Sequence, residues 1–346
     1  MFNFIFDRFS RDIGIDLGTA NTLVYVKDKG IIVNQPSVVA VNTRNDQIIA
    51  VGEDAKKMIG KTPPHIIATK PLVDGVISDF EVAEKMLKYF IDKVHRDSYA
   101  LAPRPRVVIG IPLEVTEVER KAVEDAALSA GAREVLLLEE PMAAALGARL
   151  PVRDPSGQLI VDIGGGTTEI AVISLGGVVV ARSLRTAGDE LTENIIQYAR
   201  DQFGLLLGEH SAEEIKLKIG SALPLDKPLE MRMRGRDVMT GLPREVVVND
   251  SQVREAMQKV IKLIVENVKN TIENTPPELV ADIYERGITM TGGGALLRGL
   301  DKLLSQELVV PVQVVDDPLT AVVRGTGVVL EDLENVRDLL LPSTRS

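Results

Sequence analysis

Apolar and polar positions follow two different periods along this chain, and the periods predict helices and strands in turn. Over residues 80–95, Val82, Met86 and Phe90 recur at the spacing of an amphipathic helix. Short apolar runs that end at Pro or Gly are typical of buried strands. The same patterns predict strands at 106–111, 135–138, 178–182 and 288–291, helices at 117–130, 141–149, 191–203, 211–219 and 251–275, and a further helix from Ala295. Such alternation predicts an α/β architecture, with sheets sandwiched between helices.

Two segments, residues 13–26 and 159–172, share one pattern. When Asp16 is aligned with Asp162, the glycines and threonines that follow also coincide. In each segment an apolar strand ends in Asp, turns through small residues and returns as a second β-rich strand. The segments begin about one domain length apart, so the repeat predicts two related halves that each open with the same β-hairpin.

The turns of the two hairpins have the composition of phosphate-binding loops. Backbone N–H groups in a turn of small residues can point at an anion without obstruction by side chains. The turns here are Gly18-Thr19-Ala20-Asn21 and Gly164-Gly165-Gly166-Thr167. The preceding carboxylates, Asp16 and Asp162, are suited to hold hydrated Mg²⁺ beside phosphates. One such segment can be merely a tight turn, but two matching copies favour a nucleotide site.

Two further features extend this site. Gly292-Gly293-Gly294 follows the strand at 288–291, where glycine lets a flat base or ribose lie against the backbone, although glycines there also serve packing. Glu140 follows the strand at 135–138, where a carboxylate could orient water against a γ-phosphate. An acid at the start of a helix is also favoured by the helix dipole, and the sequence leaves both interpretations of Glu140 open.

Residues 55–62 differ by one residue from a P-loop pattern, but their context argues against that motif. A working P-loop follows a strand and opens a helix with its Lys and Thr. Here residues 53–59 have a helical pattern, and Pro63-Pro64 follows at once and disfavours helix in the residue before it. We therefore do not expect phosphate binding at Lys61.

Composition excludes several other functions. The chain has 40 basic and 50 acidic residues and a net charge of −10, which argues against broad nucleic-acid binding. Cysteine is absent, so disulfides and thiolate chemistry are excluded, and the three histidines show no ligand spacing. No apolar run reaches the roughly 18 residues that a membrane-spanning helix needs. The composition fits a cytoplasmic protein.

Taken together, these residues resemble the actin, sugar-kinase and heat-shock ATPase superfamily, and within it the bacterial MreB family. The resemblance covers about residues 12–330 and is strongest at 15–22, 139–145, 161–168, 241–244, 275–279 and 291–299. It implies an α/β actin-like ATPase fold with four subdomains, and ATP and Mg²⁺ in the cleft between the halves. The implied division is an amphipathic membrane-binding segment at 1–11, subdomain IA at 12–34, 72–146 and 321–346, IB at 35–71, IIA at 147–185 and 256–320, and IIB at 186–255.

The resemblance also implies a role for each site residue. Asp16 and Asp162 would surround the metal, and Glu140 and Thr167 would place the attacking water. The nucleotide-binding set would be Gly18, Thr19, Ala20 and Asn21 in the first turn, Gly164, Gly165, Gly166 and Thr167 in the second, Glu213 and Lys216 at the ribose and adenine, and Gly292, Gly293, Gly294, Ala295 and Leu297 around the base.

The N-terminus predicts contact with a membrane surface. Phe2, Ile5, Phe6 and Phe9 follow the i, i+3, i+4, i+7 spacing that places side chains on one helical face. The alternative is that they pack on the protein's own surface. By resemblance, Tyr99 and Leu101 belong to a second inserting loop. Because Asp7 offsets Arg8, attraction to lipid charge is expected to be weaker than in many relatives.

Three functions compete at this stage. The first is a weak ATPase, coupled to polymerisation, whose filaments lie on the inner face of the cell membrane and organise cell-wall synthesis to maintain rod shape. Its partners would be copies of itself, the inner membrane surface, and the cell-wall elongation machinery with its membrane-anchored adaptors, but no nucleic acid. The second is a phosphotransferase, which would need an acceptor pocket and a base. The third is a chaperone ATPase, which would carry a long substrate-binding region after the nucleotide domain.

Overall fold

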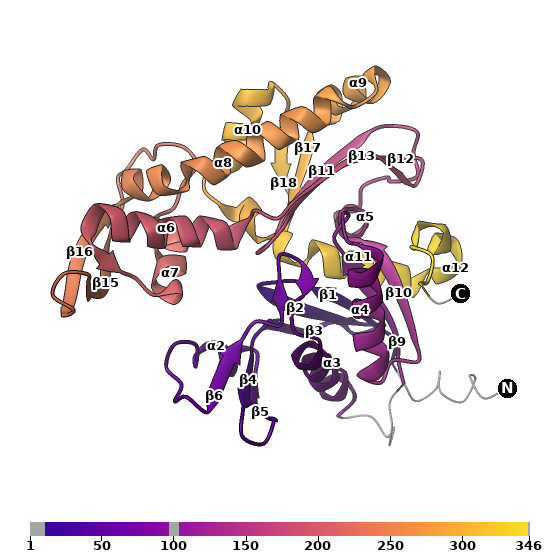
Figure 1. Ribbon diagram of the computed structural model, residues 1–346. Helices are drawn as coiled ribbons and strands as arrows, with labels where there is room; N and C mark the ends of the chain where they lie inside the picture. Colours follow the sequence, from indigo (N-terminus) through magenta and orange to yellow (C-terminus); the bar gives the residue numbers. More distant parts are fainter. Residues whose placement is uncertain (1–10, 97–103, 345–346) are drawn as a thin grey trace.

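Two five-stranded sheets, one in each half of the chain, organise the computed structural model, which describes residues 11–96 and 104–344 (Figure 1). The first sheet has the strand order β10 (Glu134–Glu139), β9 (Arg106–Ile111), β1 (Ile13–Leu17), β2 (Asn21–Val26) and β3 (Gly30–Pro36). The second has the order β13 (Gly177–Leu184), β12 (Thr168–Ser174), β11 (Gln158–Ile163), β17 (Ile288–Thr291) and β18 (Val312–Val314).

The two sheets repeat one topology, as the internal repeat predicts. β1 pairs with β2 in antiparallel register, with Asp16 opposite Leu23, and β11 pairs with β12, with Asp162 opposite Glu169. On the other side, β1 lies parallel to β9 and β11 lies parallel to β17. The prediction of two related halves, each opening with the same hairpin, is confirmed.

Helices cover both faces of each sheet, so that the molecule is layered. On the first sheet, α3 (Phe80–His95) and α4 (Glu117–Ser129) share a core with β1 and β9. Between the sheets, α5 (Glu140–Gly147) and α11 (Ala321–Glu331) pack against both. The second sheet's other face carries α6 (Gly188–Phe203), α8 (Asp250–Glu273), α9 (Pro277–Arg286) and α10 (Leu300–Leu308), and α7 (Glu209–Ile219) packs on α6 and α8. The predicted sandwich of sheets between helices is confirmed.

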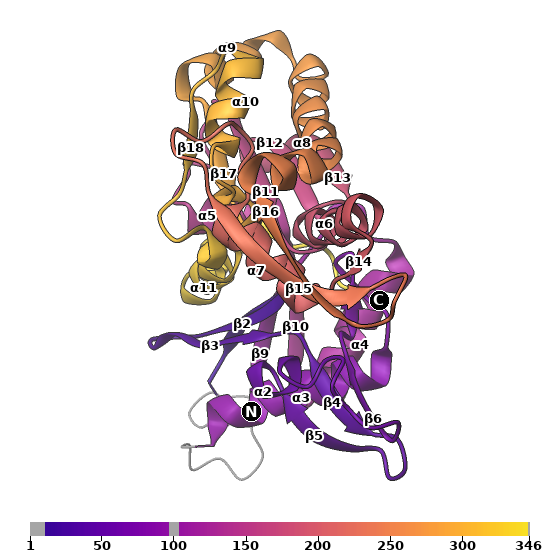
Figure 2. The same ribbon diagram turned by 90° about the vertical axis from the view of Figure 1, so that its left-hand side faces the viewer.

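Two glycines let α5 and α11 cross closely where the halves meet (Figure 2). A Cβ on Gly147 would lie 1.8 Å from the carbonyl oxygen of Ala321, and one on Gly325 would lie 1.8 Å from that of Ala143. No side chain fits at either position, because real Cβ atoms stay more than about 3 Å from such atoms. The close crossing joins the two halves between their large sheets.

Two small sheets lie on the same side of the large ones (Figure 1). One consists of β5 (Gln47–Val51), β4 (Val39–Asn42) and β6 (Ile66–Thr69) with the short α2 (Glu53–Lys56), and the other of β14 (Leu205–Leu206), β15 (Glu230–Asp237) and β16 (Pro243–Asn249). The remaining elements are β7 (Leu72–Val73), β8 (Val76–Ile77), α12 (Leu333–Val336) and the 3₁₀ turns η1 (Gly293–Leu296), η2 (Pro318–Thr320) and η3 (Arg337–Leu339). Lys61 and Thr62 lie in irregular chain after α2, so the strand–loop–helix context of a P-loop is missing there.

The predicted helix at 80–95 has its predicted bounds, but two other helix predictions need correction. The helix expected from Ala295 is wrong: η1 ends at Leu296, and α10 begins only at Leu300. Gly299 separates them with a φ of +76°, a left-handed conformation that interrupts a right-handed helix. The helix expected at 191–203 begins three residues earlier, at Gly188.

Candidate functional site

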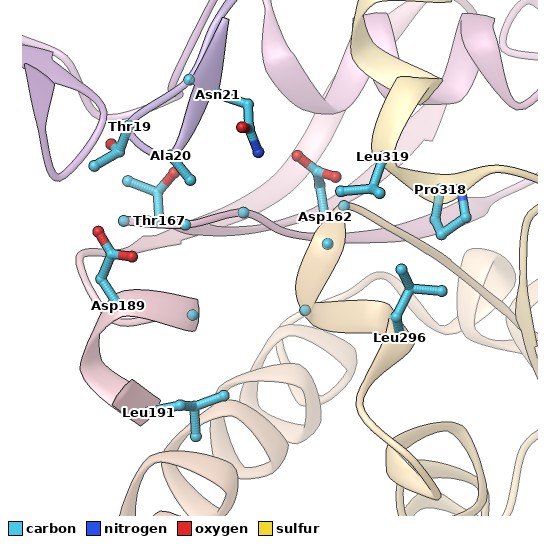
Figure 3. Close-up of a pocket in the computed structure, with 18 of the residues that line it drawn as sticks. Thr19, Ala20, Asn21, Asp162, Thr167, Asp189, Leu191, Leu296, Pro318 and Leu319 are labelled. Carbon is cyan, nitrogen blue, oxygen red and sulfur yellow. The ribbon is translucent and has the colours of Figure 1, made fainter. Parts of the chain in front are cut away.

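A cavity of about 340 Å³ lies between the two halves, and the two hairpin turns meet at it (Figure 3). Glycine is needed for this approach. A Cβ on Gly165 would lie 2.6 Å from the Cβ of Ala20, and a Cβ on Gly166 would lie 2.7 Å from Oγ1 of Thr19. The repeat therefore brings its two small-residue turns together at one place.

Hydrogen bonds from neighbouring chain hold the first turn. The N–H of Gly75 donates to Oγ1 of Thr19 at 2.9 Å, and the hydroxyl of Ser37 donates to the carbonyl of Gly18 at 2.6 Å. Ser37 also bonds the Thr22 hydroxyl at 2.8 Å. Residues outside the turn therefore hold it in place, which leaves its own backbone amides available to a ligand.

The start of α6 holds the second turn. The amides of Gly188 and Asp189 donate to the carbonyls of Gly164 and Gly165, at 3.2 and 2.7 Å. In a trans peptide the C=O and the following N–H point in opposite directions. The amides of Gly165 and Gly166 therefore point away from α6, which is the orientation an anion between the turns requires.

Asp16 and Asp162, the last acids of their strands, both line the cavity. Burial, and the nearby charge of Asp162, raise the pKa of Asp16 to about 8. Burial raises the pKa of Asp162 to about 6, although the hydroxyl of Thr291 donates to its Oδ1 at 2.7 Å and opposes the rise. Two neighbouring carboxylates that resist ionisation fit a place for a cation, because a positive charge would stabilise both.

Among the described residues no three acidic or histidine side chains come together as a complete metal site. A Mg²⁺ ion here would take its other ligands from water and phosphate oxygens, as Mg²⁺ usually does. The pair of aspartates fits that arrangement.

Glu140 is the first residue of α5 and lines the cavity with only 7% of its surface exposed. Burial is the main cause that raises its pKa well above the usual value, and the charges of Glu169, Asp16 and Asp162 add to it. The position combines both earlier interpretations: Glu140 stands in the first turn of a helix, and its carboxyl belongs to the cavity.

The other end of the cavity is more apolar and is lined by Leu191, Leu296, Pro318 and Leu319 (Figure 3). Glu213 and Lys216 of α7 also line the cavity, and Nζ of Lys216 donates to the carbonyl of Gly188 at 2.7 Å and to Oγ1 of Thr192 at 2.8 Å. Gly292, Gly293, Gly294 and Leu297 also line it. Ala295 is not among the lining residues; only 4% of its surface is exposed, and it packs into the hydrophobic core of the second half.

Comparison with known proteins assigns the chain to a family. The family model described as MreB/Mbl protein matches residues 10–338. The chain belongs to the MreB/Mbl family. It is 53% identical over 332 residues to the cell shape-determining protein MreB of Escherichia coli K12, covering 94% of this chain and 95% of that protein. It is 49% identical over 328 residues to the cell shape-determining protein Mbl of Bacillus subtilis, covering 95% and 98%.

Solved structures agree with the MreB/Mbl assignment. MreB5 of Spiroplasma citri bound to AMPPNP superposes with a TM-score of 0.89 at 38% identity, covering 95% of this chain and 98% of that one. MamK, solved as a double helical filament, superposes with a TM-score of 0.79 at 23% identity and shares the fold. The actin-like fold predicted from the sequence is confirmed, and the family match decides against the phosphotransferase and chaperone hypotheses.

Several cavity residues of this MreB/Mbl chain escape prediction from sequence. They are Leu23, Gly75, Gly188, Asp189, Leu191, Leu217, Gly220, Leu296, Arg298, Pro318, Leu319 and Val322. Of these residues, only Asp189 could have been found from sequence, because an acid is favoured in the first turn of a helix. Leu217, Leu296 and Leu319 are 63%, 55% and 42% exposed, and such apolar surface beside glycines suits a flat base.

The predicted membrane residues lie outside the described part of the chain. They are Phe2, Ile5, Phe6, Phe9, Tyr99 and Leu101. Among the helices that are described, none combines the length and the apolar character that crossing a membrane requires.

Proposed function

We propose that this protein binds ATP with Mg²⁺ between its halves, hydrolyses it slowly and assembles with copies of itself into membrane-associated filaments. These filaments organise cell-wall synthesis, together with the elongation machinery and its membrane-anchored adaptors, and so maintain rod shape. The observation that carries the proposal is the pair of matching turns that meet across one cavity. The names of the relatives agree: the Escherichia coli protein is cell shape-determining, and MreB5 of Spiroplasma citri was solved with AMPPNP and with ADP.

In this proposal the turns hold the phosphates. The amides of the first turn and those of Gly165 and Gly166 face the phosphates, because Ser37 and α6 occupy the carbonyls behind the turns. Mg²⁺ supplies charge neutralisation when bound, and Asp16 and Asp162 hold it through their carboxylates. The base lies toward Glu213, Lys216 and the apolar end of the cavity.

Hydrolysis is assigned to Glu140 and Thr167. Both side chains line the cavity, Glu140 from the first half and Thr167 from the second, so a water between them would be held by groups of both halves. Glu140 can accept a proton only when ionised, and its burial beside other acids works against that. A slow ATPase is the expected result.

Membrane attachment is assigned to the two apolar segments, and the described residues next to them support a joint role. The backbone N–H of Arg11 donates to Nε2 of His95 at 3.1 Å. Arg11 and His95, the described residues that lead toward these two segments, therefore lie side by side. Linked weak sites gain avidity, by about 10²–10⁴ in favourable geometry, so the two segments and the many copies in a filament reinforce each other.

Sedimentation tests the filament part of the proposal. With ATP and Mg²⁺, pelleted protein should appear only above a threshold concentration, because head-to-tail contacts form open filaments. Without nucleotide the threshold should rise. A protein that binds ATP but stays monomeric at every concentration would contradict the proposed assembly.

A further inference from the structure

A lysine from the first half forms ion pairs with the second half at the cavity. Lys70 follows β6, and its Nζ lies 2.6 Å from Oε1 of Glu209 and 3.4 Å from Oδ2 of Asp189. Both acids belong to the second half, where Asp189 is in the first turn of α6 and Glu209 is the first residue of α7. The lysine side chain is only 26% exposed. Because Asp189 lines the cavity, these contacts join the two halves beside it.

The two helices that Lys70 reaches also build the candidate nucleotide site. Asp189 lines the cavity, and its amide donates to the carbonyl of Gly165 in the second turn. α7 carries Lys216, which lines the cavity and bonds the carbonyl of Gly188. Lys70 therefore connects the first half to the two helices that support the phosphate turn and the base end of the cavity.

The charges of both acids favour the contact with Lys70. Burial lowers the pKa of Lys70, but the carboxylates of Asp189 and Glu209 more than offset this and raise it, so the ammonium is charged at neutral pH. For Asp189, burial raises the pKa in spite of Lys70 and Lys216, so its ionised form is costly. Both carboxylates therefore hold the ammonium, Asp189 mainly through its charge and Glu209 through the shorter, charge-assisted hydrogen bond.

We infer that Lys70 is a positioning residue that ties the two halves together across the nucleotide cavity and slows the release of bound ATP. The inference rests on the proposed ATP site and adds a residue that touches no nucleotide itself. The ion pair of Lys85 with Asp46 offers a contrast. Its Nζ–Oδ2 distance is 3.0 Å and its lysine is 29% exposed, but both partners belong to the first half.

The test measures how fast a fluorescent ATP analogue leaves the full-length protein in Mg²⁺ when excess ATP is added. Lys70→Met keeps an unbranched apolar side chain and removes the positive charge. We expect it to release the analogue about three- to tenfold faster, a modest effect because partly exposed ion pairs are weak. The release rate of Lys85→Met should stay within about twofold of that of the wild type. Lys70→Arg, which keeps the positive charge, should release the analogue about as slowly as the wild type. The gain in rate should shrink at high salt.

A charge exchange separates positioning from a general loss of structure. Lys70→Glu should release faster than Lys70→Met, because it adds a third carboxylate, and Glu209→Lys in the same chain should recover part of the slow release. Melting curves show that each variant is folded. Wild-type rates for Lys70→Met, equal changes in Lys85→Met, or no recovery in the double variant would each overturn the inference. If the wild-type protein binds no analogue, the proposed ATP site itself has failed.

Discussion

Asp162→Asn offers a test of the buried acid pair that needs no nucleotide. Burial raises the pKa of Asp162 to about 6, from an ordinary value of 3.8. The folded state therefore holds this proton more tightly than the unfolded state. By linkage, stability that is present below about pH 4 is lost as the pH rises toward 6, and the loss is complete above that. For a shift of about two units at 1.36 kcal/mol each, the ionised carboxylate costs about 3 kcal/mol at pH 7.5.

Asparagine removes this cost, and its side-chain oxygen can still accept the hydrogen bond from Thr291. In EDTA at pH 7.5 we expect the variant to melt higher than wild type, by roughly 5 °C for about 3 kcal/mol. At pH 4 the two proteins should melt together. The added stability should come with a loss of Mg²⁺-dependent stabilisation by ATP, because one ligand of the cation is gone.

Asp237→Asn is a control in which the expected change in melting temperature has the opposite sign. Hydrogen bonds from Thr240 and Arg244 lower the pKa of Asp237 to about 2, so its stabilisation is present above about pH 4 and is lost as the pH falls toward 2. That variant should melt lower than wild type at pH 7.5. Should Asp162→Asn melt lower than wild type at pH 7.5 in EDTA, the carboxylate is stabilising in the free protein and our explanation of the pair is wrong.

Three further predictions concern the remaining assignments. Glu140→Gln should keep ATP binding while phosphate release falls by about 10²-fold or more, as expected for a group that acts in the transition state; a parallel fall in affinity would make Glu140 structural. Lys61→Ala should change ATP affinity by less than about twofold in the same titration, and a large loss would revive the P-loop at 55–62. Deleting residues 1–9 should release filaments from liposomes in a flotation assay and leave ATP affinity intact, and flotation at the wild-type level would exclude this segment as the anchor.

Sequence alone predicts the part of this site that is built from local chain. A strand that ends in Asp, followed by a turn of small residues, is recognisable within about ten residues, and its second copy shows that the chain folds as two similar halves. The register confirms this, since Asp16 and Asp162 occupy equivalent places in their hairpins. The roles of the site residues and the subdomain boundaries stay predictions.

Residues that distant parts of the chain bring together were beyond prediction from sequence. Leu296, Pro318 and Leu319 reach the cavity because β17 lies beside β11 and β18 lies beside β17, and nothing in their own surroundings marks them. The helix expected at Ala295 failed for a local reason, since the left-handed Gly299 separates the 3₁₀ turn from α10. The tie at Lys70 likewise depends on how the halves face each other.

Calorimetric titration of ATP with Mg²⁺ into wild type and Gly166→Ala tests the central claim most directly. A Cβ on Gly166 would lie 2.7 Å from Oγ1 of Thr19 and 2.9 Å from Cα of Asp74, so alanine forces the two turns apart. Gly177→Ala is the matched control, since its Cβ would make only an ordinary contact, at 3.9 Å from the carbonyl oxygen of Ser174. We predict one ATP per wild-type chain, unchanged affinity in Gly177→Ala, and at least about tenfold weaker binding in a folded Gly166→Ala. Wild-type affinity in Gly166→Ala, or no binding by the wild type, would contradict a nucleotide site between the matched turns.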